Sequence, residues 1–167
     1  MNPNDIVHFL PSEELFEKAK IVFGSQKTEL EKLLPSVDIQ QVGSCAVPGA
    51  IGKFDIDIQI RTTAEQFQEI VEIMEKNYTV KHPEIWKDGF AAFSNNKEYL
   101  IDLIVTVIDS QYDDFYRVRD ALIANPELLA EYNNLKRQYE GKLYAEYREA
   151  KMNFLGGNGK VKFLDYD

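Results

Sequence analysis

Phe54-Asp-Ile-Asp-Ile-Gln-Ile60 carries the clearest structural signal in this sequence. Apolar and polar residues alternate strictly along it. Such alternation is typical of a β-strand with one buried face, because successive side chains of a strand point to opposite sides. The apolar face begins with Phe54, and the opposite, polar face carries Asp55, Asp57 and Gln59. The pattern therefore predicts a strand with two carboxylates on its polar face.

Two carboxylates on one face of a strand repel each other unless a cation lies between them. The alternative is a face that is simply exposed to solvent, as one face of an antiparallel sheet commonly is. The residues just before the strand favour a binding site. Gly43-Ser44 follows a short strand expected over residues 39–42, and the glycines of the loop over residues 45–52 let the backbone approach a ligand closely. Amide groups in such a loop can face an anion.

Asp102 is a third carboxylate, and it lies inside the apolar segment 99–107, for which we predict another strand. A charged side chain in such a strand is costly if it is buried without a partner. One interpretation is that Asp102 pairs with Lys53 or another base, or faces solvent at an edge. The other is that its strand lies beside that of Asp57, so that three carboxylates form a site for one or two Mg²⁺ ions.

The rest of the chain predicts an α+β fold, in which a sheet is followed by helices. Apolar residues at helical spacing predict helices over residues 12–34, 63–77, 113–123 and 125–154. Further strands are expected over residues 78–86 and 90–94. We expect a single domain over residues 1–155, ended by the glycines that begin at Gly156, and a short tail over residues 156–167.

A family resemblance adds to this interpretation. The segment Val42-Gly-Ser-Cys-Ala-Val-Pro-Gly-Ala-Ile-Gly-Lys-Phe-Asp-Ile-Asp-Ile58 resembles the signature of the GrpB family, which belongs to the polymerase-β-like nucleotidyltransferase superfamily. Similar motifs follow in the second half: Arg119-Asp120-Ala-Leu, Asn125-Pro-Glu-Leu, Glu131-Tyr-Asn-Asn-Leu-Lys136, Tyr147 and Lys151 to Leu155. The resemblance covers residues 37–155. It implies a nucleotidyltransferase-like mixed β-sheet flanked by helices, with a helical C-terminal part.

The resemblance also implies roles for individual residues. Those that it implies for catalysis and for holding Mg²⁺ (or Mn²⁺) are Asp55, Asp57 and Asp102. Those that it implies for nucleotide binding are Gly43, Ser44, Lys53, Lys136 and Lys151. For each of the three lysines the alternative is an ordinary solvated side chain, since surface lysine is common.

The function that the resemblance implies is metal-dependent transfer of a nucleotidyl group from a nucleoside triphosphate to a small-molecule or protein acceptor. Asp102 would then activate the acceptor hydroxyl. Two alternatives keep the same fold: a non-catalytic module that binds nucleotide or metal, and a protein-interaction module. A third makes Cys45 a nucleophile in its glycine-rich loop, although a small buried cysteine is the commoner role.

Composition limits the partners. The formal net charge of −9 argues against broad affinity for nucleic acid or for an anionic membrane, because such binding needs clustered basic residues. Apolar runs fall far short of a membrane span, and no secretory signal starts the sequence. The single cysteine excludes an internal disulfide and agrees with a reducing compartment. We therefore expect a cytoplasmic protein.

Overall fold

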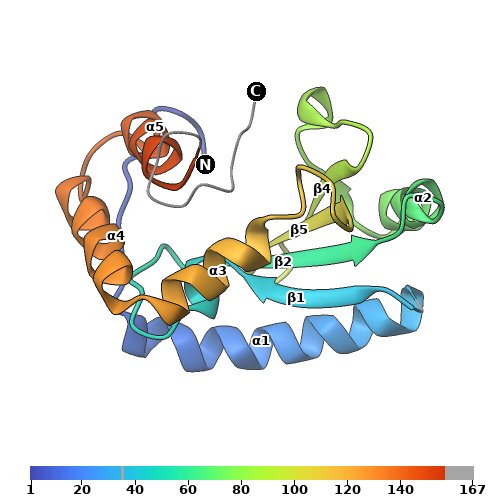
Figure 1. Ribbon diagram of the computed structural model, residues 1–167, viewed down its shortest axis with the longest axis horizontal. Helices are drawn as coiled ribbons and strands as arrows, with labels where there is room; N and C mark the ends of the chain where they lie inside the picture. The colour runs from blue at the N-terminus through green and yellow to red at the C-terminus, as the bar shows by residue number, and fades with distance from the viewer. Residues whose placement is uncertain (35, 157–167) are drawn as a thin grey trace.

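The computed structural model describes residues 1–34 and 36–156 (Figure 1). Its helices are α1 (Ser12–Leu33), α2 (Phe67–Asn77), α3 (Phe115–Ala124), α4 (Pro126–Gln138) and α5 (Tyr144–Leu155). Its strands are β1 (Asp38–Val42), β2 (Asp55–Thr62), β3 (Thr79–Val80), β4 (Phe90–Asn95) and β5 (Leu100–Val107), with short 3-10 helices at Ser44–Ala46 and Pro83–Ile85. Within this described part, no helix is both long and apolar enough to cross a membrane.

The five strands form one mixed sheet in the order β1-β2-β5-β4-β3. Strands β2 and β5 are parallel, whereas every other neighbouring pair is antiparallel. The parallel pair sets Asp57 opposite Asp102 in register. The predicted α+β class with a mixed sheet is confirmed, and the strand expected beside that of Asp57 is β5.

One face of the sheet is the apolar core. Helices α1 and α2 pack on this face through residues at helical spacing (Figure 1). The helices and the two central strands contribute buried side chains: Leu15, Ala19 and Leu30 of α1, Ile70, Val71 and Met74 of α2, Ile56, Ile58 and Ile60 of β2, and Ile101, Leu103 and Val105 of β5. The alternation seen in the sequence therefore places the carboxylates of β2 on the opposite face.

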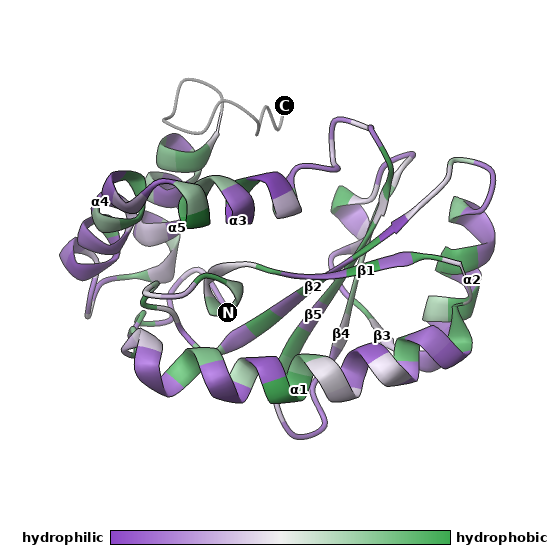
Figure 2. Ribbon diagram, turned by 60° about the horizontal axis from the view of Figure 1, so that its bottom comes forward, coloured by the Kyte–Doolittle hydropathy of each residue, from purple (hydrophilic) through white to green (hydrophobic). Residues whose placement is uncertain are grey.

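Helices α3, α4 and α5 gather on the other side of the sheet from α1 (Figure 2). A second apolar cluster joins them to the loop before β2 through Val47, Ala50, Leu122, Tyr132 and Leu155. Because α3 covers part of the polar face, that face is not simply solvated. Gln59 is fully buried, donates to Thr106 Oγ1 (2.9 Å) and Asp113 Oδ1 (3.0 Å), and accepts from the Tyr116 amide (3.1 Å).

The single helix expected over residues 125–154 is wrong. Helix α4 ends at Gln138 and α5 begins at Tyr144, with a turn between them in which Gly141 has a φ of +74°. The Gly141 amide donates to the Val7 carbonyl, and the Tyr144 amide donates to the Asp5 carbonyl. The chain turns here because the glycine adopts the left-handed conformation, and the N-terminal segment pairs with the turn.

Other boundaries shift by smaller amounts. The strand expected over residues 78–86 is only Thr79–Val80, after which His82 takes a positive φ and Pro83 starts a 3-10 helix. The helix expected from residue 63 begins at Phe67. Phe54 has a φ of +63° and lies just before β2 rather than in it. Of the tail expected over residues 156–167, all but Gly156 lies outside the described residues.

Candidate functional site

All eight residues predicted for the site line one cavity of about 240 Å³. Asp55 and Asp57 lie on β2, and Asp102 lies on β5. The three carboxylates come close together because these two strands pair in parallel, with Asp57 opposite Asp102. The other lining residues from the prediction are Gly43, Ser44, Lys53, Lys136 and Lys151. Residues far apart in the sequence thus meet on the polar face of the sheet, where α4 and α5 close the cavity.

Gly43 lies against the Asp57 side chain. The residue before it, Val42, is the register partner of Asp57 across the antiparallel β1–β2 pair. A Cβ atom at Gly43 would collide with Asp57 Oδ2, and the Gly43 φ of +73° belongs to the region that favours glycine. The glycine therefore serves both the turn into the Ser44–Ala46 helix and the close approach of the backbone to a carboxylate.

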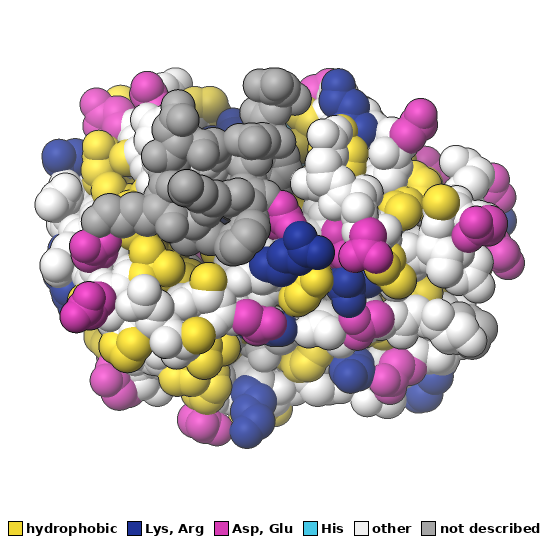
Figure 3. All heavy atoms as spheres, in the orientation of Figure 1, with side chains coloured by type: hydrophobic (Ala, Val, Ile, Leu, Met, Phe, Trp, Pro, Cys, Tyr) yellow, Lys and Arg dark blue, Asp and Glu magenta, His cyan; other side chains and the backbone are white. Residues whose placement is uncertain are grey.

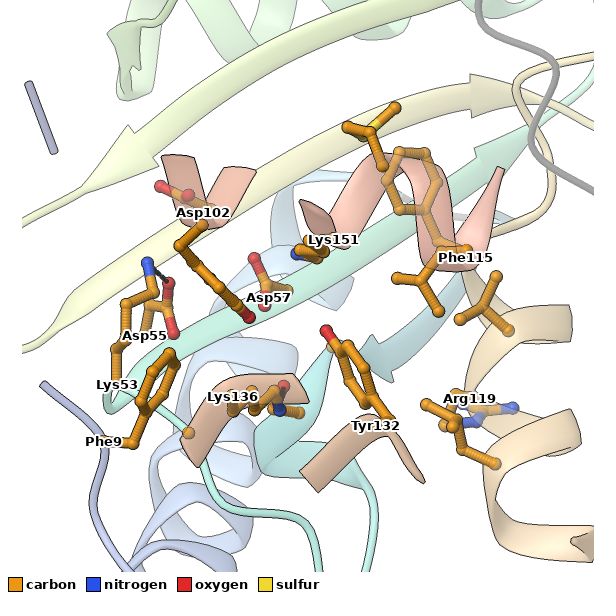
Figure 4. Close-up of a pocket in the computed structure, with 18 of the residues that line it drawn as sticks. Phe9, Lys53, Asp55, Asp57, Asp102, Phe115, Arg119, Tyr132, Lys136 and Lys151 are labelled. Carbon is orange, nitrogen blue, oxygen red and sulfur yellow. Dashed lines mark hydrogen bonds and ion pairs between the residues drawn. The ribbon is translucent and has the colours of Figure 1, made fainter. Parts of the chain in front are cut away.

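Two lysines pair with the outer carboxylates of the trio. Lys53 Nζ lies 2.8 Å from Asp55 Oδ2, and Lys81 Nζ lies 2.5 Å from Asp102 Oδ2. The second oxygen of the latter carboxylate, Asp102 Oδ1, is buried and has no hydrogen-bond partner in the described part of the chain. Figure 4 shows Lys151 beside Asp57, whereas Arg119 points away from the carboxylates.

Burial, together with the neighbouring charges of Asp55 and Asp102, raises the pKa of Asp57 to about 7. Burial acts in the same direction on Asp55, but the Lys53 ammonium outweighs it and holds the pKa of Asp55 below its ordinary value. Lys151 and Lys53 offset only part of this rise, and among the described residues no ion pair engages Asp57 directly. A cation at Asp57 would offset the remainder of the rise.

Lys136 is buried, which contradicts the alternative of a solvated side chain. Its ammonium donates to Ser44 Oγ (2.6 Å) and to the Ile51 carbonyl (2.5 Å), and it lies 4.1 Å from the centre of the Tyr132 ring. Burial lowers the pKa of Lys136. Helix α4 thus carries a cation into the cavity, directly behind the Gly-Ser turn.

Asn133, one turn before Lys136 on α4, fixes the same loop. Its Oδ1 accepts from the Ile51 amide (3.0 Å), and its Nδ2 donates to the Gly49 carbonyl (2.8 Å). Lys151 is half-buried on α5; the Tyr132 side chain, followed by the Asp57 and Asp55 carboxylates, holds the pKa of Lys151 above its ordinary value. Helices α4 and α5 therefore position Lys136 and Lys151, and α4 also holds the loop that contains Gly49 and Ile51.

Carboxylate oxygens are the ligands that Mg²⁺ and Mn²⁺ prefer, so the chemistry of the trio fits such an ion. The buried, unpartnered Asp102 Oδ1 and the raised pKa of Asp57 fit it as well. Within residues 1–34 and 36–156, however, no group of three or more His, Cys, Asp or Glu side chains is arranged as it stands to hold a metal ion. The two outer carboxylates of the trio are instead paired with the Lys53 and Lys81 ammonium groups.

Cys45 lies in the turn after Ser44 and is buried. Burial, together with the nearby Asp55 and Asp57 charges, raises the pKa of its thiol to about 12. A thiol with this pKa stays protonated near neutral pH, and the thiolate is the nucleophilic form. The geometry therefore argues against Cys45 as a nucleophile.

Sequence reasoning missed several residues of the site. Lys81 gave no signal, because it lies in a segment expected to be strand, and its partner Asp102 follows it by 21 residues. Phe9 lines the cavity because the N-terminal segment pairs with the turn before α5. That long-range pairing leaves no periodic pattern. Tyr132 of α4 is buried and also forms part of the cavity wall.

Comparison with known sequences gives consistent matches. A family model described as GrpB protein matches residues 16–157. A UPF0157 protein of Vibrio cholerae serotype O1 is 27% identical over 157 residues, which is 90% of this chain and 81% of that protein. The family match spans the Gly-Ser turn, the carboxylate strands and the C-terminal helices.

Solved structures with a similar fold include two kinds of protein. The conserved protein GrpB from Enterococcus faecalis has a TM-score of 0.59 at 19% identity, covering 72% of this chain and 76% of that one. A Cid1 poly(U) polymerase mutant bound to MgATP has a TM-score of 0.52 at 12% identity, covering 76% of this chain and 42% of the polymerase. At these identities the likeness shows a nucleotidyltransferase-like fold and nothing more.

Proposed function

This chain belongs to the GrpB family, and we propose that it is a metal-dependent nucleotidyltransferase. It would transfer a nucleotidyl group from a nucleoside triphosphate to a small-molecule or protein acceptor. The observation that carries the proposal is the carboxylate trio on β2 and β5, which shares one cavity with the Gly43-Ser44 turn and with two lysines from the C-terminal helices. The fold shared with a polymerase solved with MgATP supports it.

In this proposal Asp55 and Asp57 hold Mg²⁺ or Mn²⁺. The ion supplies charge neutralisation on the phosphates and orients them. Asp102 lies on the neighbouring strand, in register with Asp57, and takes the proton of the acceptor hydroxyl. Little covalent chemistry is asked of the protein, so positioning and electrostatics supply most of the rate enhancement.

The phosphates would lie along the Gly43-Ser44 turn. Gly43 brings the backbone of this turn against the Asp57 carboxylate, and the Ser44 hydroxyl accepts a hydrogen bond from the Lys136 ammonium. Lys151 and Lys53 add positive charge on the same cavity wall. Lysines in these positions attract a triphosphate and balance the negative charge of the trio.

The acceptor in this proposal is a small molecule or a protein. On the face shown in Figure 3, basic and acidic side chains are interspersed over the described residues, without an extended basic patch. The net charge of −9 points the same way, because nucleic-acid binding draws on clustered positive charge. A Cid1 structure in complex with ApU concerns a much longer protein, of which this chain covers 40%.

A thermal-shift panel tests the proposal. Wild-type protein and Asp57→Asn protein are heated with each nucleoside triphosphate, with and without Mg²⁺ or Mn²⁺, because a ligand that binds the native state raises the melting temperature. We expect one nucleotide to give a metal-dependent rise that Asp57→Asn abolishes. No rise with any nucleotide at about a hundred times a micromolar Kd would contradict the proposal.

The second candidate is a non-catalytic module that binds nucleotide. The observation that favours it is that Lys53 and Lys81 already neutralise two of the three carboxylates. Transfer distinguishes the two: the responding nucleotide, labelled at its α-phosphate, is incubated with the protein, Mg²⁺ and a cell extract. Label that moves to a new small molecule or protein, and fails to move with Asp57→Asn, supports transfer; binding without any transfer supports the module.

A further inference from the structure

Lys81 is tied to the trio by its side chain and to the sheet by its backbone. Its ammonium lies 2.5 Å from Asp102 Oδ2. Its amide donates to the Ala92 carbonyl (2.9 Å), and its carbonyl accepts from Trp86 Nε1 (3.0 Å). The main chain at Lys81 is therefore held on both sides, and only the long, flexible side chain is free to change position.

Lys81 occupies the position of a counter-ion. It neutralises the carboxylate that faces Asp57 across the β2–β5 pair, while Lys53 does the same for Asp55. The arrangement leaves Asp102 Oδ1 buried without a partner. A single ammonium thus satisfies one oxygen of the Asp102 carboxylate, which lies next to the half-buried Asp57 carboxylate. A divalent cation between the strands would satisfy both.

We propose that Lys81 holds Asp102 in the metal-free protein and leaves it when a divalent cation binds to the trio. The inference rests on the proposed function, since it concerns the same metal. An ammonium and a divalent cation repel strongly when they contact one carboxylate in a partly buried site. Lys81 is therefore a positioning residue that sets the metal affinity and keeps Asp102 in place until the metal arrives.

A second cavity could accept the Lys81 ammonium after it leaves Asp102. This cavity of about 660 Å³ is lined by Lys81 and shares Tyr144 and Met152 with the first, which Asp102 lines. The walls of this second cavity also carry two carboxylates, Glu84 and Glu149. Rotation of the Lys81 side chain about its fixed backbone would move its charge from Asp102 toward these acidic groups. The exchange frees Asp102 without leaving the ammonium unpaired.

Mn²⁺ binding, followed by electron paramagnetic resonance of the free ion, tests the inference without any assay of activity. Lys81→Met is expected to bind Mn²⁺ about tenfold more tightly than wild type, which corresponds to about 1.4 kcal/mol. Lys81→Gln, which retains a polar contact, should show a smaller gain. Lys87→Met is the matched control, because it removes an equal charge from an exposed position just before β4 and should change the affinity less than about twofold.

The same titration in an Asp102→Asn background separates competition for Asp102 from a general effect of charge. If Lys81 acts through Asp102, Lys81→Met tightens Mn²⁺ binding far less in that background. Two results overturn the inference and leave the proposed function standing. In the first, Lys81→Met tightens Mn²⁺ binding equally in both backgrounds. In the second, the wild-type protein binds Mn²⁺ and Lys81→Met does not tighten that binding. Absence of Mn²⁺ binding in wild type and in every variant overturns both.

Discussion

At Gly43 the backbone has a φ of +73°, and the Asp57 carboxylate lies where a side chain would begin. Gly43→Ala should therefore destabilise the protein by about 1–3 kcal/mol and displace Asp57, because the new methyl group is both strained and in collision. Chemical denaturation measures the first effect, and the loss of a metal-dependent nucleotide shift measures the second.

Gly24→Ala is the matched control for that substitution. Gly24 lies inside α1 with no atom near the position of an added Cβ. Alanine there should stabilise the protein by about 0.5–1 kcal/mol, since glycine is a poor helix former. Equal effects at the two glycines would contradict the role assigned to the Gly43 contact.

Asn133 carries a prediction at the level of the elements, because it joins α4 to the loop before β2. Asn133→Ala would leave the Ile51 amide and the Gly49 carbonyl without their side-chain partners. We expect a loss of about 1–2 kcal/mol, since two partly exposed hydrogen bonds are lost and each contributes about 0.5–1.5 kcal/mol. Urea unfolding measures it. Nucleotide affinity should fall as well, because the same loop follows the Gly-Ser turn.

Asn134→Ala, one position along α4, provides the control. Asn134 is exposed and accepts only from Arg137 on its own helix. Its replacement should change the stability by no more than about 0.5 kcal/mol. If Asn133→Ala were equally mild, the loop would not depend on α4 for its position.

The sequence predicts the elements that carry a short-range pattern. Strict alternation located β2 and its two carboxylates, and the apolar run around Asp102 located β5, because burial on one face imposes a period of two. The split between α4 and α5 was missed, since it depends on Gly141 and on pairing with Val7, far away in the chain. Gln59 looks like a surface residue in sequence, and only the packing of α3 buries it.

In the candidate site, too, residues within a local sequence motif were predicted, whereas those that depend on long-range contacts were not. The eight predicted residues meet in one cavity because the parallel pairing of β2 with β5 brings Asp102 to Asp57. The resemblance pointed to Lys136, whereas the residue alone suggested a solvated side chain; its burial comes from tertiary contacts with Ser44 and Ile51. Lys81 escaped prediction because no local pattern marks an ion pair between a loop and a strand.

The pH dependence of stability belongs to the whole molecule. The pKa of Asp57 is raised from an ordinary 3.8 to about 7, so the native state binds more protons than the unfolded state between these values. The contribution of Asp57 to the stability of the metal-free protein should therefore be greatest below about pH 4. That contribution should be lost as the pH rises through about 7.

Asp57→Asn tests this, because it removes the titrating group and the buried repulsion while keeping the shape of the side chain. Both proteins are compared by the fall in their stability from about pH 5 to about pH 8. This fall should be smaller in the variant than in wild type by at least about 1 kcal/mol, which corresponds to about 2–4 °C in melting temperature. Thermal unfolding in the presence of a chelator measures it. Parallel pH profiles for the two proteins would show that Asp57 titrates normally.

A crystal structure with Mn²⁺ and a non-hydrolysable nucleoside triphosphate tests the metal-dependent site most directly, through the anomalous scattering of the ion. The account predicts an anomalous peak at roughly 2.0–2.3 Å from carboxylate oxygens of Asp55 and Asp57, with the triphosphate along the Gly43-Ser44 turn. Nucleotide bound elsewhere, or bound in this cavity with the trio still paired to Lys53 and Lys81 and no peak between β2 and β5, would contradict it.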